Sequence, residues 1–207
     1  AGALADFLVD RGARAIVIAC NTATAAAAAR LRDRLAIPVV GLEPAVKPAA
    51  AATRSGIVGV LATAGTLASA RFAGLLDRFG EGIEVLTEPC ADLVELVERG
   101  VLTGADARTR VNAHVRPLVS AGADTLILGC THFPFLRALI QQEAGAGVRI
   151  IDTGAAVARQ LQRRLPADES AADKHGGIEL FTSGDPERFS EVAKRLWKDA
   201  PDARLLN

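Results

Sequence analysis

Two cysteines in similar short contexts are the residues of this chain whose type and spacing could do chemistry. Cys20 lies in ACNTATA (19–25), and Cys130 lies in GCTHFPFL (129–136). A thiol can act as acid or base near neutral pH because both of its forms can be populated. Two thiols on opposite faces of one carbon could remove a proton from one face and deliver a proton to the other. This pairing predicts inversion of a stereocentre.

Polar residues follow each cysteine and could bind the molecule on which the thiols act. These residues are Asn21 and Thr22 after Cys20, and Thr131 and His132 after Cys130. Together with helix N-termini, they could hold an anionic substrate that carries a carboxylate. His132 is two residues from Cys130 and could tune its protonation.

The two cysteine segments form an internal repeat. Residues 8–22 (LVDRGARAIVIACNT) match residues 118–132 (LVSAGADTLILGCTH) without a gap, at an offset of 110 residues. In both copies the cysteine follows a small or aliphatic run, which is typical of a strand buried in a parallel sheet. We therefore expect two similar domains. Each would carry a cysteine at the end of a strand, where a helix begins, and the two thiols would face each other across a cleft.

The apolar pattern alternates along the chain between short runs and helical stretches. It predicts strands at 15–19, 37–42, 56–62, 83–87, 125–129, 148–152 and 178–182. It predicts helices at 4–11, 24–35, 91–99, 105–120, 135–143, 154–165 and 186–197, and one that ends near 79. Prolines 44 and 48 mark a crossover, residues 63–66 a turn and residues 166–177 a loop.

This alternation predicts an α/β fold with two pseudo-symmetric, doubly wound domains, parallel sheets and an active site in the cleft between them. The first domain would comprise residues 1–43 and 151–207, and the second residues 44–150.

Composition excludes several classes of function. Lys and Arg together number 24, as do Asp and Glu, so the formal net charge is zero. This balance argues against a general nucleic-acid binder and gives no basis for attraction to an anionic membrane. No apolar run reaches the ~18 residues of a membrane-spanning helix. Three cysteines are too few for a disulfide framework, which favours a reducing compartment such as the cytoplasm.

The cysteine motifs closely resemble those of glutamate racemases. The resemblance extends to VGLEPAVKPA (40–49), VGVLATAGTLAS (58–69), CADLVELVERG (90–100) and FTSGDPERF (181–189). It implies that two cysteines interconvert L- and D-glutamate by proton transfer at Cα, without a cofactor or a metal. It also implies that the D-glutamate enters bacterial peptidoglycan.

The resemblance assigns roles residue by residue. It implies that Cys20 is the base acting on D-glutamate, that Cys130 is the base acting on L-glutamate, and that His132 assists Cys130. The positions that match the family's substrate contacts are Asn21, Thr22, Thr131 and His132; Thr63 and Thr66 match a loop that lines the pocket, and Glu98 matches a glutamate near the site.

The sequence departs from the family pattern at its N-terminus. The family opens with a strand ending in Asp-Ser-Gly, followed by a Pro-Tyr-Gly turn, and neither tripeptide occurs here. The sequence also contains no Met, even at residue 1. We therefore expect the first domain to be incomplete at its N-terminus, and the 207-residue chain to have little activity by itself. The resemblance further implies a homodimer.

Three alternatives remain open at the level of sequence. Another member of the superfamily, such as an aspartate racemase, would usually carry Glu at the position of His132. Cys20, Cys130 and His132 could form the zinc site of a hydrolase, although no short-spaced ligand pair is present. A binding protein could use the cleft without chemistry. Cys90 has no comparable context, and we interpret it as a packing residue.

Overall fold

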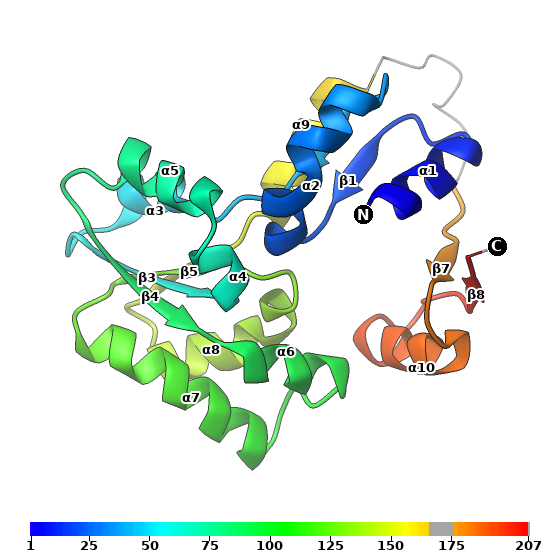
Figure 1. The fold of residues 1–207 in the computed structure, drawn as a ribbon. Helices are drawn as coiled ribbons and strands as arrows, with labels where there is room; N and C mark the ends of the chain where they lie inside the picture. Colours follow the sequence, from blue (N-terminus) through cyan, green and yellow to red (C-terminus); the bar gives the residue numbers. More distant parts are fainter. Residues whose placement is uncertain (166–175, 207) are drawn as a thin grey trace.

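The structure is a computed structural model that describes residues 1–165 and 176–206 (Figure 1). Strands and helices alternate along most of the chain, and the strand pairs are all parallel within the described residues. Most of the loop predicted at 166–177 lies outside those residues. In the part of the chain that is described, no helix is long and apolar enough to cross a membrane.

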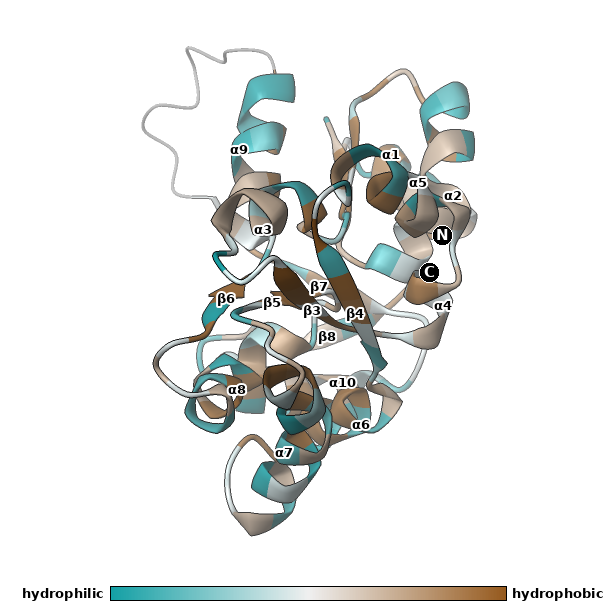
Figure 2. Cartoon of the chain, turned by 90° about the vertical axis from the view of Figure 1, so that its left-hand side faces the viewer, coloured by the Kyte–Doolittle hydropathy of each residue, from teal (hydrophilic) through white to brown (hydrophobic). Residues whose placement is uncertain are grey.

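A four-stranded parallel sheet with the order β4-β3-β5-β6 forms the centre of the larger part of the molecule. Its strands are β3 (Ile57–Ala62), β4 (Glu84–Pro89), β5 (Thr125–Leu128) and β6 (Arg149–Ile151). Every residue of β5 is buried, as are all residues of β3 but Ile57. Apart from Thr125, both strands are apolar, as is typical of strands that helices cover on both faces. Figure 2 shows the hydrophobic strands between the helices.

The two faces of this sheet have separate cores. One face packs against α6 (Ala91–Glu98), α7 (Ala105–Ser120) and α8 (Arg137–Ala144), and its core contains Leu61, Leu126 and Leu128. The other face packs against α3 (Val46–Ala52) and α5 (Ala70–Phe79), and its core contains Val58 and Val60. Successive side chains of a strand point to opposite faces, so one apolar run supplies both cores.

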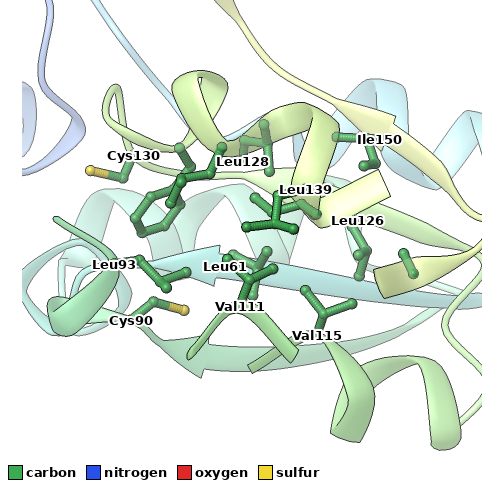
Figure 3. Packing of buried hydrophobic residues seen from close by; sticks show 14 of the residues in the cluster. Leu61, Cys90, Leu93, Val111, Val115, Leu126, Leu128, Cys130, Leu139 and Ile150 are labelled. Atoms are coloured by element: carbon green, nitrogen blue, oxygen red, sulfur yellow. The ribbon is translucent and has the colours of Figure 1, made fainter. Parts of the chain in front are cut away.

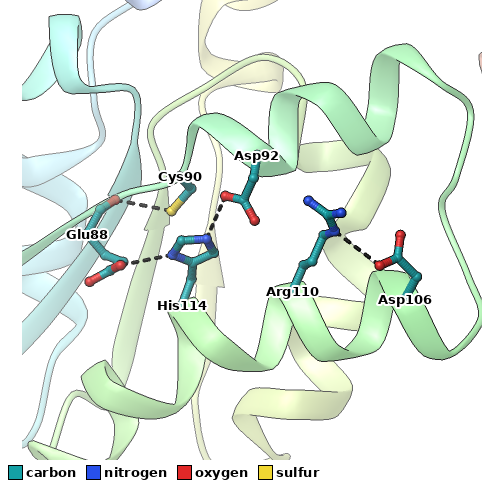
Figure 4. Close-up of polar contacts among 6 residues, drawn as sticks. All are labelled: Glu88, Cys90, Asp92, Asp106, Arg110 and His114. Carbon is teal, nitrogen blue, oxygen red and sulfur yellow. Dashed lines mark hydrogen bonds and ion pairs between the residues drawn. The ribbon is translucent and has the colours of Figure 1, made fainter.

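His114 on α7 joins three elements of this part through its two ring nitrogens (Figure 4). Its Nδ1 lies 2.9 Å from Oε1 of Glu88 on β4, and its Nε2 lies 2.7 Å from Oδ1 of Asp92 on α6. Each ring nitrogen is thus within hydrogen-bond distance of a carboxylate oxygen. The thiol of Cys90 donates to the carbonyl oxygen of Glu88 at 3.2 Å, and Cys90 is fully buried. The interpretation of Cys90 as a packing residue is therefore consistent with its surroundings.

The remaining elements form smaller groups. Strands β1 (Ile16–Ile18) and β2 (Val39–Gly41) pair with each other, as do β7 (Leu180–Thr182) and β8 (Ala203–Leu205). Around them lie α1 (Gly2–Asp10), α2 (Asn21–Arg34), α9 (Gly154–Arg164) and α10 (Pro186–Leu196). A small core that includes Ala5, Ile16, Ala28 and Leu31 joins α1, α2 and the β1–β2 pair.

Residues beyond β6 return to the N-terminal elements. Helix α9 packs against β2. The rings of Phe7 on α1 and Phe181 on β7 meet edge to face, with centroids 5.0 Å apart. The guanidinium of Arg11 lies over both rings, 4.4 Å from the centroid of Phe7 and 4.7 Å from that of Phe181. These contacts link the two segments that we assigned to the first domain. The boundaries of the two domains stay a prediction.

Four details differ from the expectations drawn from the sequence. Helix α2 begins at Asn21 rather than at 24, because Cys20 serves as its N-cap. Pro48 lies in the first turn of α3, a helix that was not predicted, where its missing N–H costs no intrahelical bond; the segment does cross from β2 to β3 of the other sheet. The turn at 63–66 includes a short helix, α4 (Ala64–Leu67). Strand β8 was not expected at all, because it is short and partly exposed.

Candidate active site

Cys20 lies at the point where β1 gives way to α2. Its backbone is extended, its carbonyl oxygen accepts from the N–H of Thr24 at 2.8 Å, and its Sγ accepts from the N–H of Ala23 at 3.4 Å. The sulfur therefore occupies the position of a capping side chain, at the positive end of a 14-residue helix. This agrees with the expectation of a cysteine at a strand end where a helix begins.

Cys130 follows β5 in a different local structure. The next helical element is a 3₁₀ turn, η1 (Phe133–Leu136), and α8 begins only at Arg137. The helix predicted at 135–143 therefore consists of this 3₁₀ turn and α8, and Cys130 lies shortly before it, separated by Thr131 and His132. Cys130 is 9% exposed. It lies at the edge of the core, with its sulfur turned away from Leu128 (Figure 3).

A histidine and a carboxylate extend from Cys130. Nδ1 of His132 lies 3.7 Å from Sγ of Cys130, and Nε2 of His132 lies 2.5 Å from Oε1 of Glu98 at the end of α6. The hydrogen bond to Cys130, opposed by partial burial and assisted by the bond to Glu98, raises the pKa of His132 to about 9. The imidazole is therefore protonated near neutral pH. A cation beside a sulfur atom stabilises negative charge on that sulfur.

Three threonine hydroxyl groups form a closed triangle near the start of α2. Oγ1 of Thr22 lies 2.8 Å from Oγ1 of Thr63 and 3.0 Å from Oγ1 of Thr66, and the latter two are 3.1 Å apart. Thr63 also caps α4, because its side chain accepts from the N–H of Thr66. The triangle connects the first turn of α2 to the carboxyl end of β3.

Asn21 connects α2 to the carboxyl end of β5. Its Nδ2 donates to the carbonyl oxygen of Gly129 at 2.8 Å, and the side chain is buried. The Oδ1 of the same amide has no hydrogen-bond partner among the described residues. Asn21 directly follows Cys20, and Gly129 directly precedes Cys130.

The candidate residues thus form three groups around the ends of α2, β3 and β5. Cys130, His132 and Glu98 form one chain of contacts; Thr22, Thr63 and Thr66 form the triangle; and Asn21 links the two cysteine segments. Thr131 is partly exposed between Cys130 and His132. The contribution of Gly129 was missed, because a backbone carbonyl leaves no signal in a sequence.

A groove borders the first of these groups at Glu98. It has a volume of about 540 Å³ and separates α10 from α6 and η1, and Glu98 is on its wall. The zinc hypothesis gains no support from the geometry, because no group of three or more His, Cys, Asp or Glu side chains within residues 1–165 and 176–206 is arranged to hold a metal ion.

Comparison with known proteins identifies the family. The model of the Asp/Glu/hydantoin racemase family matches residues 1–161. This chain belongs to the Asp/Glu/hydantoin racemase family. The membership agrees with the resemblance found in the cysteine motifs, and together with the relatives described next it makes the chain an amino-acid racemase, an isomerase.

Relatives of this racemase support the same assignment. The glutamate racemase of Pseudomonas putida KT2440 is 55% identical over 97% of this chain, which covers 77% of that protein. The crystal structure of a glutamate racemase isoform from Bacillus anthracis has a TM-score of 0.83 at 32% identity, over 99% of this chain and 77% of that one. The Escherichia coli glutamate racemase, solved with L-glutamate and the activator UDP-MurNAc-Ala, has a TM-score of 0.81 at 32% identity, over 93% and 75%. The predicted fold class is confirmed.

Proposed function

We propose that this racemase interconverts L- and D-glutamate, with Cys20 and Cys130 as the two acid/base groups. The observation that carries the proposal is the chain of contacts from the Cys130 thiol through His132 to Glu98, in a protein 55% identical to a glutamate racemase over 97% of its length. The structure of the Escherichia coli relative with L-glutamate supports glutamate as the substrate.

The reaction conserves protons and involves no redox change. With L-glutamate bound, the Cys130 thiolate takes the α-proton, so that the Cα–H bond breaks and an S–H bond forms. The Cys20 thiol then gives its proton to the opposite face of Cα, which yields D-glutamate and leaves a thiolate at Cys20. The reverse reaction begins from that state, with the roles exchanged. No cofactor or metal takes part in either direction.

His132 and Glu98 prepare one of the two thiols. The protonated imidazole is 3.7 Å from Sγ of Cys130, so it stabilises the thiolate that removes the proton. Glu98 accepts from Nε2 and fixes the orientation of the ring. At Cys20 the N-terminus of α2 stabilises the thiolate instead, with the N–H of Ala23 directed at the sulfur.

The remaining polar groups would bind the charged ends of glutamate. The Oδ1 of Asn21 is a buried acceptor without a partner among the described residues, so it suits the α-ammonium group. The hydroxyl groups of Thr22, Thr63, Thr66 and Thr131, with the N-terminus of α2, suit the carboxylates.

The proposed product indicates the biological role of the reaction. D-glutamate is a component of bacterial peptidoglycan, so we assign this racemase to cell-wall biosynthesis. All three cysteines are free, which is typical of a protein of a reducing compartment, and we place the enzyme in the cytoplasm. We also propose that it forms a homodimer and binds neither nucleic acid nor membrane.

The test is racemisation by three cysteine variants of the intact protein. Cys20→Ala and Cys130→Ala should each lower the rate by about 10²-fold or more, because each removes one acid/base group. Cys90→Ala is the matched control: Cys90 is buried and its thiol donates to the carbonyl oxygen of Glu88, away from the proposed acid/base groups, so this variant should still racemise glutamate. Chiral chromatography of the amino acid follows both directions. Wild-type rates in Cys20→Ala or in Cys130→Ala would contradict the proposal.

A further inference from the structure

The residue that follows one cysteine is hydrogen bonded to the residue that precedes the other. Nδ2 of Asn21 donates to the carbonyl oxygen of Gly129 at 2.8 Å, across 108 residues of sequence. The link from Cys20 to Cys130 therefore runs through two peptide units and one hydrogen bond.

The orientation of the amide follows from the chemistry of its partner. A backbone carbonyl only accepts hydrogen bonds, so the nitrogen of the Asn21 side chain is the end that faces Gly129. Asn21 is only 5% exposed. A buried bond of this kind is not readily replaced by a bond to water, so it restrains both segments.

Both partners of this bond are held firmly by their own elements. The N–H of Gly129 donates to the carbonyl oxygen of Leu61 at 2.7 Å, so the peptide before Cys130 is bonded to β3 as well as to α2. A Cβ atom at position 129 would lie 2.9 Å from that oxygen, which shows how closely the two chains approach. On the other side, Cys20 and Asn21 are part of the capped first turn of α2.

We propose that Asn21 is a positioning residue that sets the placement of Cys130 relative to Cys20. The inference rests on the proposed function, because placement matters only if both thiols act on one carbon. In such a reaction a displacement of about 1 Å can cost about 100-fold in rate. Loss of the bond to Gly129 lets the two segments move apart, so that proton removal continues while delivery to the opposite face fails more often.

The test uses two variants and one control in the intact protein. Asn21→Asp keeps a side-chain oxygen but places an acceptor against the carbonyl of Gly129, and Asn21→Ala removes the amide entirely. The control is Asn112→Ala, which removes a similar bond from Nδ2 of Asn112 on α7 to Oε2 of Glu143 on α8 (2.7 Å). The reaction starts from L-glutamate in deuterated buffer. Two quantities are measured: the rate of racemisation, and the deuterium gained at Cα by glutamate that is recovered as the L-enantiomer.

The expected result separates positioning from a general loss of stability. Both Asn21 variants should lower kcat by about tenfold or more, and KM should change less in Asn21→Asp than in Asn21→Ala. The ratio of the deuterium gained by L-glutamate to the rate of racemisation should rise in both variants. In Asn112→Ala this ratio should remain that of the wild type, even if its thermal unfolding temperature falls.

Two outcomes would overturn the inference, and they are distinguishable. If the wild-type protein racemises glutamate and a folded Asn21 variant keeps both its kcat and its deuterium ratio, Asn21 does not position the thiols. If the folded wild-type protein neither racemises glutamate nor exchanges its α-proton, the proposed function is wrong and the inference falls with it. If Asn21→Asp does not fold, Asn21→Ala decides the first outcome.

Discussion

At the scale of single residues, three cysteines of one chain have three different surroundings. Cys20 is the N-cap of a helix, Cys130 lies beside a histidine, and burial among apolar groups raises the pKa of Cys90. The motifs predicted which two thiols would be set apart from the third. They did not predict which contacts would distinguish these thiols, because the contact between Glu98 and His132 joins residues that lie 34 positions apart. Such a contact depends on the tertiary fold.

The protonation of His132 gives a prediction at this scale. Its pKa is raised from 6.5 to about 9, so the stabilisation from its charged form is present below pH 6.5 and is lost as the pH rises through about 9. NMR titration of the imidazole should therefore show a midpoint near 9. Cys130→Ala should lower this midpoint more than Glu98→Gln does, because the bond to Cys130 makes the largest contribution. A wild-type midpoint near 6.5 would contradict this account of the site.

At the scale of elements, β5 shows how a strand can place a site. The apolar run at 125–129 predicted it well, since residues buried on both faces leave a continuous signal. The features that were missed lack such a signal. The start of α2 at Asn21 was missed because its cap is a sulfur in place of an oxygen, and β8 was missed because it is short and partly exposed. The contacts that hold the two ends of β5 also became evident only in the structure. Asp124 makes them before the strand, and Gly129 makes them after it.

Gly129 should not tolerate a side chain. A Cβ would lie 2.9 Å from the carbonyl oxygen of Leu61, which cannot withdraw because it accepts from the N–H of Gly129. Gly129→Ala should lower the free energy of unfolding by about 1–3 kcal/mol. Gly74→Ala on α5 is the matched control: it has open space around the added atom and should raise stability by about 0.5–1 kcal/mol. Urea unfolding measures both, and an equal effect of the two changes would contradict the prediction.

Asp124, which precedes β5, should make the free energy of unfolding depend on pH in the acidic range. Partial burial opposes its ionisation, but bonds from Thr53, the N–H groups of Arg54 and Ser55, and Thr125 hold the pKa of Asp124 well below its ordinary value of 3.8. The stabilisation is therefore present above pH 3.8 and is lost as the pH falls further below it.

This dependence can be measured by urea unfolding at a series of acidic pH values. Between pH 5 and pH 2, the wild-type protein should lose more unfolding free energy than Asp124→Asn does, because the variant has no carboxylate to protonate at this position. Asp77→Asn, which changes an exposed aspartate of α5, should follow the wild-type curve. Parallel curves for the wild type and Asp124→Asn would show that the bonds to Asp124 contribute nothing.

At the scale of the whole molecule, the alternating pattern predicted an α/β fold with parallel sheets, and this is confirmed. The pattern did not predict the strand order β4-β3-β5-β6, because the apolar runs do not encode their neighbours. It also did not predict that Phe181 would pack against Phe7, since that contact joins segments 174 residues apart in sequence. The connection between residues 1–43 and the C-terminal segment therefore needs a separate test.

Phe181→Ala provides that test. Loss of the ring, with its contacts to Phe7 and Arg11, should lower the free energy of unfolding by about 1–3 kcal/mol. Hydrogen exchange should quicken in α1 and β7, while the amides of β3 and β5 remain protected. Phe135→Ala removes an exposed ring from η1 and should have little effect on α1. Equal loss of protection in β3 and β5 would show that the two parts do not open separately.

The central claim is that two thiols invert one carbon, and the most direct measurement is proton NMR of L-glutamate with the intact protein in D₂O. The account predicts loss of the α-proton signal together with the appearance of D-glutamate that carries deuterium at Cα. In Cys20→Ala, formation of D-glutamate should slow by about 10²-fold or more. If the folded, reduced wild-type protein leaves the α-proton in place, or if Cys20→Ala forms D-glutamate at the wild-type rate, the two-thiol account is wrong.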